Sequence, residues 1–541
     1  MPANNPVAAG SALSGSVIRS VPTLPAVNAP VDSTETANQK INVTKSGVMG
    51  SSPTDFKTIR LSGFESDIVD DVAGYRIVSK YFSLQLAEKD WARVSNEIWE
   101  AYRDLGRLVR VDLVANRGEY VVSVSQLHVR KVTVRGTASV NENDLKRIER
   151  VVREYVPEGK VADLLQLKKF LLRVDYRARE TIATQVVSVD GDGVDITFTV
   201  AVREKVESKP WQLAVDDYGL AGFGRDRASA RYSAPLFSAG DNLAVQALFS
   251  VGQEFGSVRY DFPLPVYLPI RGSIWSSLLH YNVDNALDQT GQAAMAGVDL
   301  SYPFFLWGGA LITSSLGYEF KGSKDYVQSV TTILTQKWLN NVHLRASGEN
   351  FWGGRVSFSG DLTMGNLYIA QGPALTQDKA GAKTKGSFTK LYAEAQFLQP
   401  ITPRTSFSLN LKGQIPNKNL DSLEKFSFGG NVGVRAYGSD VGNADEGVLG
   451  SVAYFVALNT HFPARVGAFY DYALGKQSRK PYPGEYGPGE ANGFQMDAAG
   501  IQFLANYKDF MLNASAAHPV TPSIIKPGQG WRLWAQLTYS F

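Results

Sequence analysis

The chain has 541 residues, of which 44% are hydrophobic and 20% are charged, and its formal net charge is +3. This balance argues against nucleic acid as a partner, because phosphate-binding proteins concentrate basic residues on one surface. It also argues against global disorder, which requires low hydrophobicity and a high net charge. Cysteine is absent, so the usual signatures of disulfide-stabilised mini-domains and of thiolate metal sites are missing.

No run of about 18 apolar residues, the minimum for a membrane-spanning helix, is present in the sequence. The first residues, Met1–Pro6, lack the basic region and the apolar core of a signal peptide. We therefore expect either a soluble protein or one that crosses a membrane as strands and whose export signal is missing from this sequence.

The first segment, residues 1–53, is rich in Ala, Ser, Pro, Gly and Thr and shows little apolar periodicity. This composition predicts a linker, and a disordered tether is the interpretation that we favour. Gly15 and Pro22 limit any helix between Ser14 and Val21 to one or two turns.

From Phe56 to about Lys205 the pattern becomes a mixture of strands and helices, and it restarts at Val129. The predicted elements are, in chain order, strand 56–64, helix 90–105, strands 108–114, 120–124 and 129–134, helices 143–155 and 162–176, and strands 185–189 and 194–202. Because the pattern restarts, we predict two copies of a β-α-α-β-β module. A single α+β domain of unspecified role is the alternative.

From Trp211 to Phe541 the helical patterns stop, and segments of alternating polar and apolar residues follow one another. These segments have about 9–11 residues, the length of a tilted transmembrane strand, and aromatic residues flank their apolar faces. Their polar faces repeatedly carry charges, which a water-filled lumen tolerates and the dry core of a soluble sandwich does not. We predict an all-β transmembrane barrel of about 16 antiparallel strands, from about 330 residues at roughly 20 per strand.

Short connections marked by proline follow several of these strands, at Pro235, Pro263, Pro303, Pro400 and Pro463. Longer glycine-rich or charged stretches lie between them, and bacterial barrels place short turns in the periplasm and long loops outside. Counting strands back from the C-terminus makes the long segment around residues 416–446 an external loop, the sixth.

This long segment places an arginine in apolar company, because Arg435 lies between Val434 and Tyr437. A later strand contains Asp471, which faces the lumen if its neighbours Tyr470 and Tyr472 face lipid. The alternative is a glycine-rich loop that serves only solubility.

Val434-Arg435-Ala436-Tyr437 resembles the Val-Arg-Gly-Tyr/Phe loop motif of the outer-membrane assembly and two-partner secretion superfamily. Phe469, Asp471 and Ala473 resemble the strand motif Phe-x-Asp-x-Gly of that superfamily. The resemblance implies that the loop folds back into the lumen and that Arg435 pairs with Asp471. Ala436 and Ala473 replace the usual glycines, which requires a negative φ at both positions.

Two further features extend the resemblance. The last strand, with Trp531, Tyr539 and Phe541, resembles the signal by which barrel proteins are recognised for insertion. The two modules resemble POTRA domains, and two of them match the two-partner secretion transporters of the TpsB type, the haemolysin/haemagglutinin secretion-activation proteins. The domains implied are a linker at 1–53, in which the family often has a helix that plugs the barrel, POTRA domains at 54–126 and 127–207, and the barrel at 208–541.

The resemblance implies an outer-membrane protein with periplasmic POTRA domains that secretes a partner exoprotein, which adds a strand to a POTRA sheet. The partner classes are adhesins, haemolysins and contact-inhibition toxins, and lipid and the barrel-assembly machinery are expected partners during biogenesis. No nucleotide-binding motif is present, so we expect secretion without nucleotide hydrolysis. We expect no catalytic residue, metal or cofactor. The alternatives are a barrel-assembly factor of the same superfamily, a passive porin and an enzyme, for which catalytic motifs are missing.

Overall fold

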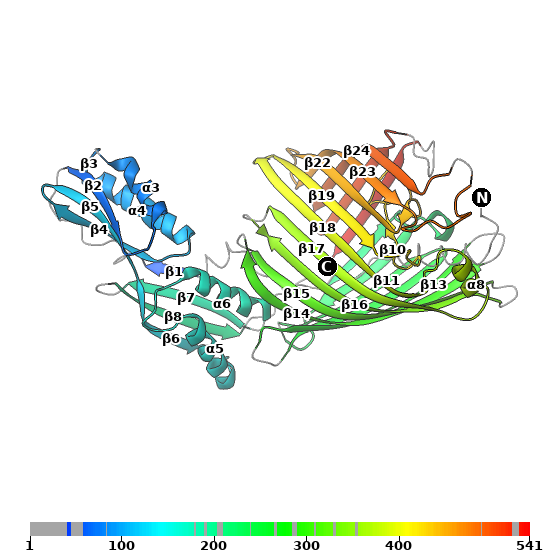
Figure 1. The fold of residues 1–541 in the computed structure, drawn as a ribbon, viewed down its shortest axis with the longest axis horizontal. Helices are drawn as coiled ribbons and strands as arrows, with labels where there is room; N and C mark the ends of the chain where they lie inside the picture. The colour runs from blue at the N-terminus through cyan, green and yellow to red at the C-terminus, as the bar shows by residue number, and fades with distance from the viewer. Residues whose placement is uncertain are drawn as a thin grey trace. The chain divides into compact units, whose positions relative to one another are not determined.

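The computed structural model describes residues 41–44, 58–82, 84–177, 180–188, 192–202, 209–238, 240–264, 268–283, 289–307, 310–327, 332–351, 355–487, 490–521 and 530–541. They divide into two compact units, one made mainly of residues 28–204 and one made mainly of residues 205–541 (Figure 1). Within the described part of the chain, no helix has the length and apolarity needed to cross a membrane.

The first α+β module consists of β2 (Ile59–Ser66), α3 (Val72–Val78), the 3-10 turn η1 (Ser79–Tyr81), β3 (Gln85–Leu86), α4 (Glu88–Asp104), β4 (Val109–Asn116) and β5 (Glu119–Gln126). Its sheet has the order β3-β2-β5-β4, with β5 parallel to β2 and antiparallel to β4. The Asp71 side chain caps α3 by accepting from the Gly74 amide (3.0 Å). It also accepts from the Tyr102 hydroxyl of α4, so one carboxylate ties the two helices together.

The second module repeats this connectivity with β6 (His128–Gly136), α5 (Glu142–Tyr155), α6 (Leu164–Arg177), β7 (Glu180–Ser188) and β8 (Gly193–Val202). Its sheet has the order β6-β8-β7, and a fourth strand, β1 (Ile41–Thr44), pairs with the outer edge of β7. Asn141 caps α5 by accepting from the Asn143 amide (2.8 Å). Both modules therefore follow β-α-α-β-β, and α3 is a short helix that the sequence patterns did not reveal.

The two modules share one apolar core. Leu127, which joins them, donates its amide to the Leu108 carbonyl (3.0 Å) and accepts from the Ala162 amide (2.7 Å). Gly106 has a φ of 81°, and a Cβ there would lie 2.3 Å from the Leu165 Cγ, so only glycine fits at this junction.

The second unit is a closed antiparallel barrel of 16 strands, in the order β10 to β19, β22 to β26 and β9. Its strands are β9 (Trp211–Asp216), β10 (Arg227–Ala234), β11 (Asn242–Ser250), β12 (Gln253–Pro263), β13 (Arg271–Val283), β14 (Gln289–Trp307), β15 (Ala310–Val327), β16 (Thr332–Asn350), β17 (Val356–Ile369), β18 (Gly386–Thr402), β19 (Thr405–Pro416), β22 (Glu446–Ala457), β23 (Ala464–Lys476), β24 (Gly493–Tyr507), β25 (Phe510–His518) and β26 (Arg532–Ser540). The last strand closes on the first through five residue pairs, from Gln536 with Asp216 to Ser540 with Gln212. The predicted 16-strand barrel preceded by α+β elements is confirmed.

The strands differ in length more than the sequence predicts. β14, β15 and β16 have 19, 18 and 19 residues, whereas β9 has 6 and β26 has 9. Pro303 and Pro400, which mark predicted turns, lie inside β14 and β18, so these turns come later in the chain. Each proline lies at a shift of strand register, where a missing backbone N–H is tolerated.

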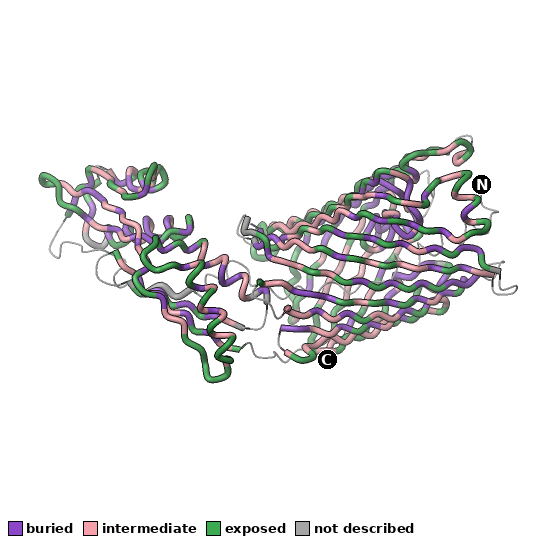
Figure 2. Tube along the Cα trace, turned by 60° about the horizontal axis from the view of Figure 1, so that its bottom comes forward, coloured by how far each residue is buried: buried purple, intermediate pink, exposed green. Residues whose placement is uncertain are grey.

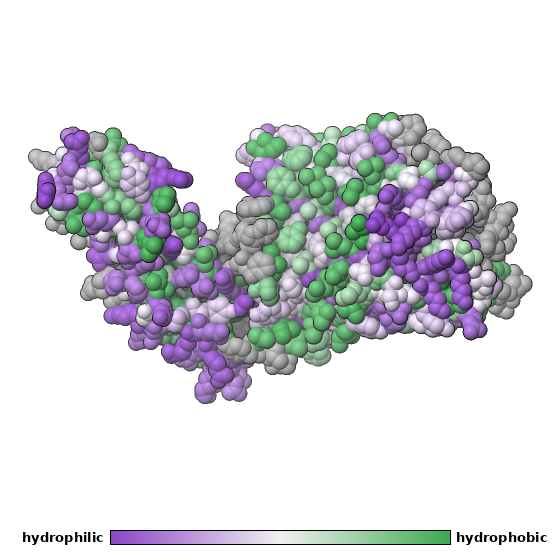
Figure 3. Space-filling model, viewed as in Figure 1, coloured by the Kyte–Doolittle hydropathy of each residue, from purple (hydrophilic) through white to green (hydrophobic). Residues whose placement is uncertain are grey.

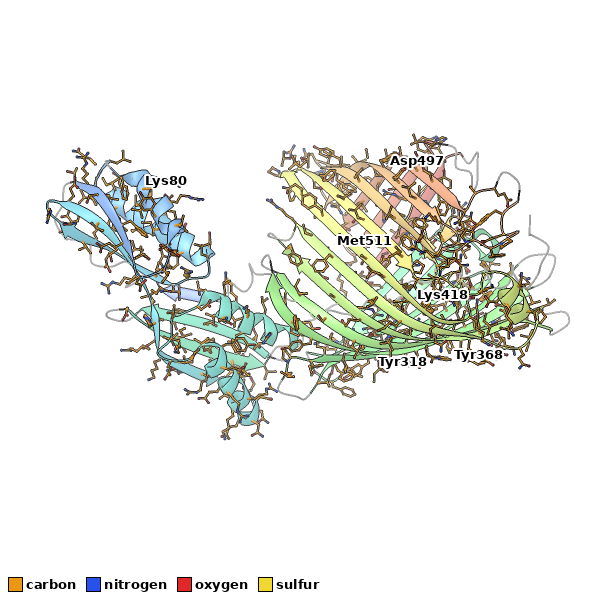
Figure 4. All side chains as sticks on the ribbon, in the orientation of Figure 1. Lys80, Tyr318, Tyr368, Lys418, Asp497 and Met511 are labelled. Carbon is orange, nitrogen blue, oxygen red and sulfur yellow. The ribbon has the colours of Figure 1, made fainter. Side chains whose placement is uncertain are left out.

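Successive residues of the barrel strands alternate between the lumen and the outer surface (Figure 2). On β26, Leu533 and Leu537 are 63% and 41% exposed, whereas Trp534 between them is buried. Hydrophobic side chains cover the strands on the face shown in Figure 3, and hydrophilic ones gather nearer the end at which α8 (Pro373–Ala380) lies. Tyr318 and Tyr368, labelled in Figure 4, lie on the outside of the barrel. This outer face is the apolar band that a lipid bilayer requires.

Candidate functional site

The segment between β19 and β22, residues 417–445, is named here the inward loop. Two short strands within it, β20 (Phe426–Ser427) and β21 (Asn443–Ala444), pair to form its stem. Gly430 and Gly442 have φ values of 103° and 74°, a conformation that glycine adopts without strain. A Cβ on Gly433 would lie 2.3 Å from the Phe428 carbonyl oxygen. Glycine at these positions therefore lets the loop fold tightly on itself.

The tip of the inward loop is held by an ion pair between Arg435 and Asp471 of β23. The guanidinium donates in bidentate fashion, from Nε to Oδ2 (2.8 Å) and from Nη2 to Oδ1 (2.6 Å). The Arg435 amide adds a third bond to Oδ2 (3.1 Å). The Asp471 side chain is fully buried and that of Arg435 is 10% exposed, so little water screens this pair.

Four strands contribute further contacts to Arg435. Nη1 donates to Gln502 of β24 (3.1 Å), and Nη2 donates to Ser451 of β22 (3.1 Å). The guanidinium carbon lies 3.2 Å from the ring centre of Phe469 on β23, a cation–π arrangement. The Trp534 indole of β26 donates to the Arg435 carbonyl (2.6 Å). Only the lumen side of the wall can offer all these groups at once, so the loop tip lies inside the barrel.

The apolar residues of the loop tip pack against the same sector of the wall. Phe428, Val434, Ala436 and Tyr437 are buried together with residues of β22 to β25, namely Leu449, Ala453, Phe455, Phe469, Ala473, Phe494, Met496, Ala498 and Ala517. Burying a side chain of the size of Phe428 or Val434 stabilises the folded position by roughly 1.5–3 kcal/mol. Neither Ala436 nor Ala473 has a positive φ, so alanine is accommodated at both motif positions.

The root of the inward loop is held by a second set of charges, which the sequence motifs do not include. Glu424 lies 2.9 Å from Lys321 Nζ of β15 and 2.8 Å from Lys390 Nζ of β18, and its side chain is 1% exposed. The Asn341 amide of β16 donates to the same carboxylate (3.0 Å). Asp421 accepts from Lys337 of β16 (2.8 Å). The root therefore rests on β15 to β18.

A ladder of charges continues along the lumen face of β12 to β17. Its pairs are Arg259–Asp261 (3.0 Å), Arg259–Asp299 (3.9 Å), Arg345–Asp299 (2.7 Å), Arg345–Asp361 (2.6 Å), His343–Asp361 (3.0 Å) and His343–Glu319 (3.4 Å). Glu319 also lies 2.9 Å from Lys321, so the ladder joins the root of the inward loop. This level of the lumen is polar, as the alternating charges of the sequence indicate.

Another level of the lumen is apolar, which the sequence did not predict. Leu279, Tyr281 and Val283 occupy consecutive inward positions of β13 and are buried. They belong to a cluster that includes Leu375 of α8 and Leu420 and Leu423 of the inward loop. The loops therefore fold over the lumen and bury its apolar positions, so these residues resemble core residues rather than the wall of an open pore.

The predicted C-terminal signal residues lie on the outer face of the barrel. Trp531 and Phe541 are 67% and 46% exposed, and Tyr539 stacks on Phe510 (4.7 Å between ring centres) and on Phe541 (5.3 Å). Trp534 was missed by the sequence motifs, although its position opposite the apolar face of β26 marks it as inward. Among the described residues, no group of three or more His, Cys, Asp or Glu side chains could hold a metal ion.

Residues 199–451 match the family model of the haemolysin secretion/activation protein ShlB/FhaC/HecB. The heme/hemopexin transporter protein HuxB of Haemophilus influenzae is 21% identical over 475 residues, which cover 84% of this chain and 82% of HuxB. CdiB from Escherichia coli has a similar fold, with a TM-score of 0.58 and 16% identity over 91% of this chain and 92% of that structure. CdiB from Acinetobacter baumannii gives 0.57 and 12%, with 92% of both chains covered.

The barrel fold and these similarities indicate a protein of the outer membrane whose α+β modules lie in the periplasm. They also support secretion of a partner exoprotein. The matched family is one of protein transporters. The match of residues 199–451 to the family model and the similarity to HuxB, together with the closed barrel, support a two-partner secretion transporter.

Proposed function

We propose that this transporter binds its unfolded exoprotein through the α+β modules, passes it through the barrel without nucleotide hydrolysis, and carries out no catalytic step. The observation that carries this proposal is the inward loop, which is fixed to the wall at its tip by Arg435 and at its root by Glu424. A chain that passes through this lumen has to pass beside the loop or displace it. Such a movement would have to break the ion pairs of Arg435 and Glu424.

Residues 54–126 and 127–207 act as two POTRA domains in this proposal. Their shared connectivity and their equivalent sheet orders, β2-β5-β4 and β6-β8-β7, support the assignment. An extended segment of the exoprotein would add to a sheet edge, where backbone hydrogen bonds supply affinity and alternate side chains supply selectivity. Folding of the exoprotein outside the cell would supply the drive for secretion.

The exoprotein is proposed to be a large β-rich protein, and adhesins, haemolysins and contact-inhibition toxins are the candidate classes. The similarity to a protein named as a heme/hemopexin transporter fits a secreted cargo without selecting one class. Outer-membrane lipid would contact the apolar outer face. The barrel-assembly machinery would recognise the last strand, β26, whose flanking residues Trp531 and Phe541 are exposed.

The test is a comparison of secreted proteins and outer-membrane proteins in cells with and without the gene for this chain. We expect one large exoprotein to disappear from the medium while the other outer-membrane barrels keep their levels. A general fall in outer-membrane barrels would instead identify a barrel-assembly factor, and the proposed route through the lumen would be wrong.

A further inference from the structure

Three segments at one end of the barrel each contribute a lysine to the same region of the surface. Lys385 belongs to the connection between β17 and β18, Lys418 to the start of the inward loop, and Lys480 to the connection between β23 and β24. The barrel strands alternate in direction from β9, which follows the periplasmic modules, so all three segments lie at the opposite, external end. These three residues are named here the rim lysines.

One buried side chain, that of Asn419, joins the three segments. Its amide nitrogen donates to the Ala382 carbonyl (3.0 Å) and to the Lys480 carbonyl (2.8 Å), and its amide oxygen accepts from the Lys480 backbone amide (2.6 Å). The Lys418 ammonium donates to the Lys385 carbonyl (2.8 Å). These bonds fix the backbones of the three segments, so the rim lysines stay near one another although their charges repel.

The positive charge of the rim lysines is not offset by ion pairs. Among the residues that the structure describes, no carboxylate forms an ion pair with any of the three. Asp378 lies in the same connection as Lys385, but it accepts from the Thr384 hydroxyl (2.6 Å) and from two backbone amides. Burial lowers the pKa of Lys418, Asp378 acts in the opposite direction, and Lys480 lowers the pKa further. An anion bound between the lysines would relieve this repulsion.

An aromatic pair on the outer surface lies beside the rim lysines. Tyr368 of β17 and Trp338 of β16 are register partners, and their rings stack with centres 4.2 Å apart. Lys385 Nζ lies 4.8 Å from the centre of the Tyr368 ring. Tyr368 and Lys418 are labelled in Figure 4, near the end of the barrel at which α8 lies. Aromatic girdles mark the level at which the apolar band meets the lipid headgroups, so the rim lysines lie at headgroup level.

We propose that the rim lysines form a binding site for the phosphate-bearing headgroup of an outer-leaflet lipid, whose acyl chains lie along Tyr368 and Trp338. Clusters of lysine at a membrane surface attract anionic headgroups, and phosphate oxygens accept charge-assisted hydrogen bonds from ammonium groups. The position favours a lipid over the exoprotein, because Lys385 and the aromatic pair face away from the lumen. The inference adds a ligand to the transporter and does not depend on how the exoprotein passes through it.

A headgroup at this site would connect the inward loop to the surrounding lipid. Lys418 is close in the chain to Asp421 and Glu424, which form ion pairs with Lys337 and Lys321 in the lumen. The bound lipid would hold the start of the inward loop from outside the barrel, while these pairs hold it from inside. The root of the loop would therefore be fixed from both sides of the wall.

The first test measures how much diphosphorylated lipid A, a phosphorylated glycolipid, the full-length protein retains in native mass spectrometry. The glutamine variant carries Lys385→Gln, Lys418→Gln and Lys480→Gln, and an arginine variant changes the same three residues but keeps their charges. Heat-dependent gel mobility shows whether each barrel has assembled. Dephosphorylated lipid A and inorganic phosphate are offered separately, to distinguish the acyl chains and the free anion from the complete lipid.

A control variant removes the same charge far from the membrane. It carries Lys80→Gln, Lys131→Gln and Lys146→Gln, three exposed lysines of the α+β modules. We expect the unmodified, arginine and control proteins to retain diphosphorylated lipid A, and the glutamine variant to retain about tenfold less. Equal retention by the glutamine variant would overturn the inference. So would equal retention of dephosphorylated lipid A, or full competition by inorganic phosphate, because the ligand would then not be a phosphate-bearing lipid.

A second measurement locates the site without any substitution. Diphosphorylated lipid A should slow amide hydrogen exchange of the unmodified protein at residues 382–385, 417–420 and 479–480, because a shared ligand stabilises all three segments. The tight turn between β11 and β12, at the same end of the barrel, should exchange at an unchanged rate. Exchange that does not respond in the three segments, or that slows equally at this turn, would show that the lipid does not bind at the rim lysines.

Discussion

The tip and the root of the inward loop are held in different ways. At the tip, one guanidinium meets one carboxylate and stacks on an aromatic ring, amid a large apolar cluster. At the root, Glu424 lies between two lysines, and Glu319 supplies a second carboxylate nearby. The tip contacts β22 to β26, whereas the root contacts β15 to β18, so the loop stretches across the lumen. The two ends of the loop could therefore be released separately.

The largest effect is expected from Arg435→Ala. It leaves the fully buried Asp471 without its cation, and breaking such a pair costs about 3–5 kcal/mol. We expect secretion to fall strongly while the barrel still assembles, measured as exoprotein in the medium and as the heat-dependent gel mobility of the barrel. Arg435→Lys keeps the charge without the bidentate geometry and should give an intermediate loss. Normal secretion by a well-folded Arg435→Ala protein would remove the tip anchor from the mechanism.

A smaller effect is expected from Glu424→Ala at the root. Lys321 keeps Glu319 as a partner, so the change leaves less unpaired charge than Arg435→Ala does. We expect the root to detach while the tip stays bound, which should raise the ion conductance of the barrel in planar bilayers. Glu424→Gln keeps the shape and one acceptor oxygen but replaces the other with an NH2 donor, so it separates the loss of charge from the loss of volume. If Glu424→Ala closes the pore or leaves its conductance unchanged, the two ends do not move independently.

A finer test of the tip is Trp534→Phe, which removes the indole donor to the Arg435 carbonyl but keeps an aromatic ring. The loss of one hydrogen bond is expected to weaken the anchor by about 0.5–1.5 kcal/mol. Faster amide hydrogen exchange at Arg435 and Ala436 would report it. Trp531→Phe, at the exposed position just before the same strand, should leave this exchange unchanged. Equal changes in both variants would point to the strand rather than to the anchor.

The smallest effect is expected from an ion pair at the surface of the second module. Its contribution to stability is a reference against which the contributions of the buried anchors can be compared. A hydrogen bond from Arg130 lowers the pKa of Asp195 below its ordinary range. The pair therefore stabilises the folded module fully at pH values above the ordinary pKa of an aspartate. This stability is lost as the pH falls through the lowered pKa. Because Arg130 is 57% exposed, Arg130→Ala should cost less than about 1 kcal/mol at pH 7.

The measurement for this pair is amide exchange of β6 and β8 between pH 7 and pH 3. The difference between Arg130→Ala and the unmodified protein should shrink as the pH falls toward the lowered pKa of Asp195, because protonation of the carboxylate removes the pair. A difference that grows at low pH would contradict the sign of the effect.

The sequence predicted the parts of the molecule that repeat a local pattern. Alternation predicted the barrel and put Asp471 on the lumen side, and the motif around Arg435 pointed to its partner. The sequence did not reveal the root anchor. Glu424 and Lys321 are 103 residues apart, and nothing in the sequence indicates which charged residues of the polar faces pair with each other. α3 has only seven residues, too few for a periodic stripe.

Tertiary contacts also explain the other differences. β1, described over residues 41–44, pairs with β7, which lies far along the chain, and no local pattern indicates such a partner. The apolar level of the lumen depends on loops that cover it, which no alternation within a strand can report. The predicted linker with its boundary at residue 53, and the plug helix that the resemblance allows within it, fall outside the described residues, apart from β1.

The unequal strand lengths have a consequence for the surrounding membrane. Six residues of β9 measure about 20 Å along the strand, and a tilt of roughly 45° reduces the height to about 14 Å, less than the apolar band of about 25 Å that is typical of outer-membrane barrels. β14 to β16 are about three times as long and face no such shortage. Lipids beside β26 and β9 would have to compress or tilt, whereas those on the opposite side keep their normal packing. The bilayer around this transporter is therefore expected to be thinned on one side only, next to the line where the barrel closes.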